Sequence, residues 1–194
     1  RQMCIRDSPT GQRILASLFQ AVTPRTAGYN TVDLTEMSNI SRAVTILLML
    51  TGGAPGSTAG GMKVTTLAVL AANAVAAFFR REDPQLFRRR LEPSAVRNAA
   101  AILLLYLALT VAGAAVIGAV EGLPLGACLY ETASAAGTVG LTLGLTPQLG
   151  TLSQGILILL MFFGRVGGLT LIYAAFSGHD LTYARYPQEK ITVG

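Results

Sequence analysis

Two short stretches of this chain have the residue types that can hold a cation without its water shell. Each has the pattern Thr-x-Gly followed by an aromatic or aliphatic residue, and together they comprise Thr26, Ala27, Gly28, Tyr29, Thr138, Val139, Gly140 and Leu141. The carbonyl groups of such a stretch can all point one way if its glycine takes backbone conformations that other residues avoid. Rings of such carbonyls replace the hydration shell of K+ in selectivity filters. Thr-x-Gly alone is common, so these residues leave open the alternative that Gly28 and Gly140 only end helices.

The two stretches occupy the same place in a repeated order of segments. A short apolar segment precedes each of them, at residues 13–23 and 125–136, and a long apolar region follows each. The interval of this repeat is 112 residues, from Gly28 to Gly140. A short helix that stops inside a membrane leaves its last carbonyls unpaired and presents the negative end of its dipole. Both properties favour a cation at the end of each short segment.

A glycine-rich run interrupts the first long apolar region, residues 43–79. Five glycines and a proline within residues 51–61 cannot remain a regular helix. Non-helical backbone at membrane depth is tolerated where it lines a cavity, so the favoured interpretation is a flexible gate beneath the filter. The residues assigned to this gate are Gly52, Gly53, Gly56, Ser57, Thr58, Gly60, Gly61 and Lys63. A nucleotide-binding loop is the weaker alternative, because that motif needs lysine directly after its second glycine and here Met62 intervenes.

Arg165 is a lone charge inside the last long apolar region. A charge at membrane depth is expensive and is usually functional or paired. We expect Arg165 to face the pore axis near the glycine-rich gate, where it adds a positive barrier and hydrogen bonds. The alternative is that its long side chain reaches the inner membrane surface.

The composition and the positions of the charges indicate a membrane protein. Hydrophobic residues make up 52% of the chain and charged residues 13%, about half the usual share in a soluble domain. The net charge of +5 does not indicate a nucleic-acid partner, because basic residues gather in one linker between apolar regions. These residues are Arg80, Arg81, Arg88, Arg89, Arg90 and Arg97. We place this linker in the cytoplasm, and a solvated loop, a lipid-headgroup site and a partner-docking site all remain compatible with it.

The elements that must position these residues follow from the apolar blocks. Residues 99–120 carry no charge and can cross a hydrocarbon core about 30 Å thick. Residues 132–164 are also charge-free, over more length than a straight helix needs, so the chain must break there. Cys4 and Cys128 give neither a disulfide framework nor metal-ligand spacing. The expected fold is an all-α polytopic membrane protein with helix–pore loop–helix repeats, re-entrant pore helices and a broken transmembrane helix.

The expected divisions of the chain follow the same blocks. They are residues 1–12, unassigned and expected to include a non-native start; 13–80, a pore loop and broken helix; 81–97, the cytoplasmic linker; 98–178, a helix, pore loop and helix; and 179–194, a cytoplasmic tail.

Five motifs in this order resemble the Trk/Ktr/HKT superfamily of potassium transporters, and most closely its bacterial Ktr-type membrane subunit. They are FQAVTPRTAGYNTVDL at 19–34, GGAPGSTAGGMKVTT at 52–66, SAAGTVGLTLGLTP at 134–147, GRVGGLT at 164–170 and YPQEKITVG at 186–194. The resemblance implies a plasma-membrane protein, not an enzyme, with four linked helix–pore loop–helix repeats around one pore. It implies that Gly28 and Gly140 are the filter glycines of the third and fourth loops, with residues 52–61 as the gate and Arg165 beside it.

The resemblance also implies cargo and partners. K+ is the transported ion, Na+ activates many Ktr-type systems, and family members form homodimers that bind a cytosolic ring of nucleotide-sensing subunits. Two departures from the family pattern are Gly168, where proline is frequent, and Ala135-Ala136, where a bulkier residue is usual. Two loops form only half of a filter, so we expect the natural protein to extend further at its N-terminal side. A non-conducting membrane partner protein remains the alternative function.

Overall fold

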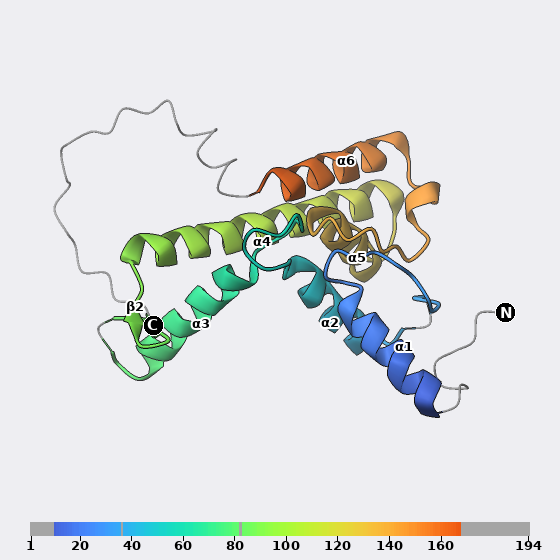
Figure 1. The fold of residues 1–194 in the computed structure, drawn as a ribbon. Coiled ribbons are helices and arrows are strands. Elements are labelled where there is room, and N and C mark those ends of the chain that lie inside the picture. The colour runs from blue at the N-terminus through green and yellow to red at the C-terminus, as the bar shows by residue number, and fades with distance from the viewer. Residues whose placement is uncertain (1–9, 36, 82, 168–194) are drawn as a thin grey trace, which may run out of the picture.

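The structure is a computed structural model that describes residues 10–35, 37–81 and 83–167. These residues form mostly helix, with one small hairpin in the linker and one 3-10 turn (Figure 1). The helices are α1 (Thr10–Val22), α2 (Asn39–Leu50), α3 (Val64–Phe78), α4 (Pro93–Glu121), α5 (Leu125–Ala136) and α6 (Thr151–Val166). The hairpin pairs β1 (Gln85–Leu86) with β2 (Arg89–Arg90), and the 3-10 turn η2 is Thr146–Gln148.

Helix α5 lies at the centre of the packing and contacts α2, α4 and α6. Its residues from Tyr130 to Ala136 are all buried, although the helix has only 12 residues. Helix α1 precedes the other Thr-x-Gly stretch, yet none of its residues is buried, and it projects from the rest of the fold (Figure 1). The second short segment is therefore a core element, and the first lies at the edge of this part of the protein.

The first long apolar region forms two helices that are separated by the glycine-rich run. Helix α2 begins where the Ser38 hydroxyl accepts a hydrogen bond from the Ser41 amide, an ordinary N-terminal cap. It ends at Leu50, and α3 starts only at Val64. The break falls where glycine and proline remove helical preference, as the sequence predicted.

Helix α4 is, among the residues described, the one helix long and apolar enough to cross a membrane. It has 29 residues and ends at Gly122, whose φ of 67° is the left-handed conformation common after helices. It starts at Pro93, inside the stretch predicted to be linker, because proline favours the first turn of a helix.

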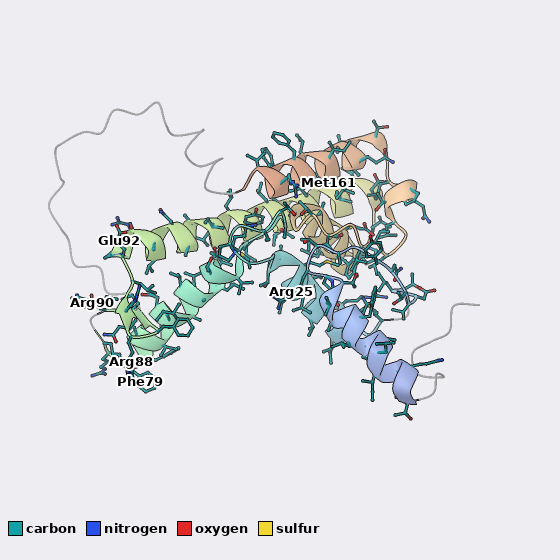
Figure 2. All side chains as sticks on the ribbon, in the orientation of Figure 1. Arg25, Phe79, Arg88, Arg90, Glu92 and Met161 are labelled. Carbon is teal, nitrogen blue, oxygen red and sulfur yellow. The ribbon has the colours of Figure 1, made fainter. Side chains whose placement is uncertain are left out.

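The rest of the linker forms a tight, arginine-rich turn between α3 and α4. Gln85 pairs with Arg90 and Leu86 with Arg89 in the hairpin, and Arg90 also forms an ion pair with Asp83. Figure 2 shows Phe79, Arg88 and Arg90 gathered at this end of the molecule. The basic residues that indicated a cytoplasmic linker thus lie together at one end of α4.

Helix α6 lies along the second half of α4 (Figure 1), and a carboxylate joins their ends. The Gly150 amide and the Ser153 hydroxyl both donate to Glu121 Oε1, at 2.8 and 2.6 Å. A carboxylate that accepts bonds at a helix N-terminus also interacts favourably with the helix dipole. Glu121 therefore fixes where α6 starts relative to the end of α4.

We expect Ser153→Ala to lower the free energy of unfolding by about 1 kcal/mol, the usual net value of one hydrogen bond. Ser153 is fully buried, and its hydroxyl donates to Glu121, which would keep its bond from Gly150. Thermal unfolding of the full-length protein in detergent measures the effect. Thr151→Ala, at an exposed position of the same turn, is the control, and equal midpoints for the two variants would contradict the prediction.

Candidate functional site

The two Thr-x-Gly stretches have the same unusual backbone conformation. Thr26 and Gly28 have φ values of 64° and 72°, and Thr138 and Gly140 have φ values of 54° and 85°. Left-handed conformations are uncommon for a β-branched residue such as threonine. Each stretch therefore has left-handed residues at its first and third positions, and it begins within four residues of the end of a short helix.

The two stretches lie against each other. A Cβ atom placed on Gly28 would lie 2.3 Å from the Val139 carbonyl oxygen, closer than real Cβ atoms approach. Backbone therefore meets backbone, and only glycine fits at this position. Val139 and Leu141 are buried, whereas Tyr29 is 72% exposed, so the second stretch is more deeply packed than the first, although Gly140 within it is exposed.

Local hydrogen bonds hold each stretch to the end of the helix before it. The Thr23 hydroxyl donates to the Tyr29 carbonyl at 2.6 Å, and the Gly28 amide donates to the Thr23 carbonyl at 3.2 Å. In the second stretch the Val139 amide donates to the Ser134 carbonyl at 2.9 Å. These bonds satisfy part of the unpaired backbone at the ends of α1 and α5.

A local acidic turn follows the first stretch. The hydroxyl and the amide of Thr35 both donate to Asp33 Oδ1, at 2.6 and 2.9 Å. The hydroxyl bond, followed by the amide bond, lowers the pKa of the Asp33 carboxyl below its ordinary value. Asp33 is therefore an exposed, ionised carboxylate at neutral pH.

The glycine-rich run closes on itself at its base. The Gly52 amide donates to the Met62 carbonyl at 2.6 Å, and the Met62 amide donates to the Leu50 carbonyl at 3.1 Å. Lys63 Nζ donates to the Ser57 and Ala59 carbonyls, at 3.1 and 2.5 Å. The lysine thus satisfies carbonyls of its own loop, which is not how a phosphate-binding loop uses its lysine.

The same run contacts the second Thr-x-Gly stretch. The Gly60 amide donates to the Thr138 hydroxyl at 3.1 Å, and a Cβ atom on Gly60 would overlap the Thr138 side chain. A Cβ atom on Gly137 would lie 2.4 Å from the Met49 carbonyl oxygen. The end of α2 and the run that follows it therefore lie directly against the turn at the end of α5. Gly56 lies away from this contact, with open space around its Cβ position.

Arg165 reaches the glycine-rich run from α6. Its guanidinium donates a hydrogen bond to the Thr58 carbonyl. Next to it, the Gly164 carbonyl accepts from the Gly61 amide and from the Tyr106 hydroxyl, both at 3.4 Å. The structure thus brings the predicted gate residues and Arg165 together, with α4 as their support.

Two supporting residues were absent from the predicted site, namely Gly164 and Tyr106. Gly164 lies so close to the end of α5 that a Cβ atom would be 2.1 Å from the Ala136 carbonyl oxygen. Its place directly before the lone Arg165 was a usable signal. Tyr106 had none, because one tyrosine in an apolar helix is ordinary.

Among the residues described, one helix of membrane length packs against the short buried helix α5, and this arrangement is compatible with a helical membrane protein. The family model of the cation transport protein TrkH matches residues 1–180, so this chain belongs to that family. Family members are transporters rather than enzymes, and membership implies a membrane location.

Curated relatives agree with this membership. The chain is 37% identical over 182 residues to the Ktr system potassium uptake protein B of Bacillus subtilis, covering 94% of this chain and 41% of that protein. It is 37% identical over 189 residues to the potassium/sodium uptake protein NtpJ of Enterococcus hirae, covering 94% of this chain and 42% of that protein. It is 36% identical over 186 residues to the Ktr system potassium uptake protein B of Vibrio alginolyticus, covering 95% of this chain and 40% of that protein. The chain therefore spans about two fifths of the length of these relatives.

We expect Gly164→Ala to destabilise the protein by about 1–3 kcal/mol, the usual cost of overpacking a close contact. The added methyl group meets a backbone carbonyl at the end of α5, which cannot change rotamer to make room. The thermal midpoint of the full-length protein in detergent measures the effect.

Gly155→Ala is the matched control, because Gly155 lies on the same helix with nothing within 4 Å of its Cβ position. Alanine should be neutral or slightly stabilising there, since it has the higher helix propensity. A Gly164→Ala protein as stable as Gly155→Ala would show that α5 and α6 are not in contact at this point.

Proposed function

We propose that the protein containing this chain conducts K+ across the membrane through a filter of backbone carbonyls. The observation that carries this proposal is the contact between two Thr-x-Gly stretches with the same left-handed pattern, each at the end of a short helix. Neighbouring loops around one pore axis would meet in this way. The relatives are potassium or potassium/sodium uptake proteins by name, and this supports the choice of cargo.

In this proposal residues 26–29 and 138–141 are two of four filter loops. Backbone carbonyls replace the water shell of K+, and the negative helix ends of α1 and α5 favour a cation at the same place. Residues 13–80 and 98–178 belong to the third and fourth helix–pore loop–helix repeats, with α1 and α5 as re-entrant pore helices. Helices α2 and α6 begin at residues 39 and 151, which is the same interval that separates Gly28 from Gly140, and this supports the repeat.

Residues 52–63 form the gate in this proposal. Their contact with Thr138 supports a position beside the proposed fourth filter loop. The run is held by separate hydrogen bonds rather than by a helical ladder, so breaking a few of them would let it change shape. Arg165 holds the loop through Thr58 and adds a positive charge that opposes a cation. The gate is thereby attached to α6, so that a movement of this helix moves the loop.

The assembly and orientation follow from the family resemblance. We propose a homodimer of the full-length subunit in the plasma membrane, with a cytosolic nucleotide-sensing ring bound to its inner face. Residues 81–97 and the tail would lie in the cytoplasm, since arginine-rich loops stay on that side. Na+ would act as an activator. The tail, residues 179–194, lies outside the described residues.

Growth of cells that lack K+ uptake tests the proposal. The complete gene should restore growth in low K+, and purified full-length protein in vesicles should carry K+ down its gradient. A membrane partner that does not conduct would give neither result.

Gly28→Ala should lower K+ uptake by at least about tenfold, because backbone strain of about 1–3 kcal/mol is added to a clash in the filter, and about 1.4 kcal/mol corresponds to a factor of ten. Alanine at a φ of 72° is strained, and its methyl group would displace the Val139 carbonyl of the other filter loop. The measurement is K+ influx at equal protein abundance. Gly122→Ala is the control, since Gly122 has a similar φ of 67° but open space around it. Equal influx in the two variants would argue against residues 26–29 as part of the filter.

Arg165→Gln should raise steady K+ flux by about twofold or more, because a charged hydrogen bond to the gate is lost. It also removes the positive charge from the pathway. Arg165→Lys retains the charge, so its steady K+ flux should be closer to that of the unsubstituted protein. Flux through proteoliposomes, measured for all three proteins side by side, decides between them. Unchanged flux in Arg165→Gln would remove Arg165 from the gate.

A further inference from the structure

Glu131 is a buried carboxylate in the middle of α5 that the proposed filter and gate do not use. It is 4% exposed and is surrounded in sequence by uncharged residues. Taking a carboxylate out of water costs several kcal/mol unless hydrogen bonds compensate for it. Its partners therefore indicate why the chain keeps an acid at this place.

Three donors from one turn satisfy Glu131. The Thr142 hydroxyl and the Leu143 amide donate to Oε1, at 2.7 and 2.8 Å. The Thr146 hydroxyl donates to Oε2 at 2.8 Å. Hydrogen bonds to an ionised acceptor are about twice as strong as neutral ones. Both carboxylate oxygens thus bind the segment that follows the filter stretch.

The same turn has a second layer of bonds centred on Thr142. Its hydroxyl oxygen accepts from the Gly144 amide at 2.9 Å and lies 3.2 Å from the Thr146 hydroxyl. Thr142 comes directly after Leu141, the last filter residue. The carboxylate therefore fixes the position at which the chain leaves the filter.

The other filter loop lacks an equivalent acid. One repeat interval before Glu131 the residue is Phe19, which is apolar. The Asn30 side chain accepts from the Val32 amide at 3.3 Å, and Asp33 accepts from Thr35, so these bonds stay within the loop. The link back to the short helix is made by the Thr23 hydroxyl, which donates to the Tyr29 carbonyl. The two loops are thus held by different chemistry.

We propose that Glu131 is a positioning residue that holds the fourth filter loop at the spacing needed for K+. This inference rests on the proposed function. The carboxylate touches no ion; it acts through Thr142, Leu143 and Thr146 on the carbonyls before them. Loss of the acid would leave a part-buried amide and two hydroxyls without this acceptor, and the loop would relax. A relaxed loop discriminates less between ions of similar size.

The test compares ion preference with stability in the full-length protein. K+ and Rb+ influx into proteoliposomes are measured separately, at one fixed Na+ concentration, together with the thermal midpoint. Glu131→Ala should lower the ratio of K+ to Rb+ influx by about threefold or more, given the weight of charged hydrogen bonds. Glu131→Gln should keep the ratio of K+ to Rb+ influx close to that of the unsubstituted protein. Its amide oxygen still accepts from Thr142 and Leu143, and the Thr146 hydroxyl can accept from its amide nitrogen.

Glu121→Ala is the matched control. Glu121 is also a carboxylate that accepts from a backbone amide and a hydroxyl, but its partners lie at the start of α6. We expect it to lower the midpoint and leave the K+ to Rb+ ratio unchanged. If Glu131→Ala lowers only the midpoint, as Glu121→Ala does, the positioning role is overturned. The positioning role is also overturned if Glu131→Gln lowers the ratio of K+ to Rb+ influx as much as Glu131→Ala does.

Two further variants decide the matter if Glu131→Ala does not fold. Thr142→Val and Thr146→Val each remove one donor and leave the acid in place. Each should lower the K+ to Rb+ ratio, and unchanged ratios in both would overturn the inference. Absence of K+ influx in the unsubstituted protein would instead reject the proposed function.

Discussion

Close approach of one backbone segment to another is the constraint on which this site depends. Gly28 lies against the Val139 carbonyl, Gly137 against the Met49 carbonyl, and Gly164 against the Ala136 carbonyl. These three contacts join both Thr-x-Gly stretches, the end of α2 and α6 into one unit. Since a side chain at any of the three glycines would separate the segments, hydrogen bonds such as Gly60 to Thr138 depend on them as well. The elements contact one another through main-chain atoms, which cannot change rotamer to relieve a clash.

Much of the fold followed from the apolar blocks, and the exceptions have physical causes. The glycine-rich run divides α2 from α3, and the charge-free residues 132–164 divide into α5, a turn and α6. The start of α4 was missed because the charge-free block marks only the residues suited to lipid. A helix can begin several residues before such a block. Helix α4 starts at Pro93, ahead of the apolar block, and Arg97 lies inside the helix.

The site was predictable in residue type and less so in conformation. Glycine explains the left-handed backbone at 28 and 140, but sequence gives no reason to expect it at Thr26 and Thr138, where packing must supply the energy. The lone charge of Arg165 indicated the gate, but its partner, the Thr58 carbonyl, depends on how the loop folds. Glu131 was overlooked because an acid in a short helix shows its purpose only when the distant turn that it binds is known.

The contacts at Gly28 and Gly164 also limit how this protein can evolve. When two side chains touch, a larger residue on one side can be offset by a smaller one on the other, and related sequences then show correlated changes. At these two glycines the opposing atom is a carbonyl oxygen, which every amino acid carries. No second substitution can make room, so neither position has a compensating partner. Methods that infer contacts from correlated substitutions should therefore fail to detect the contacts at Gly28 and Gly164.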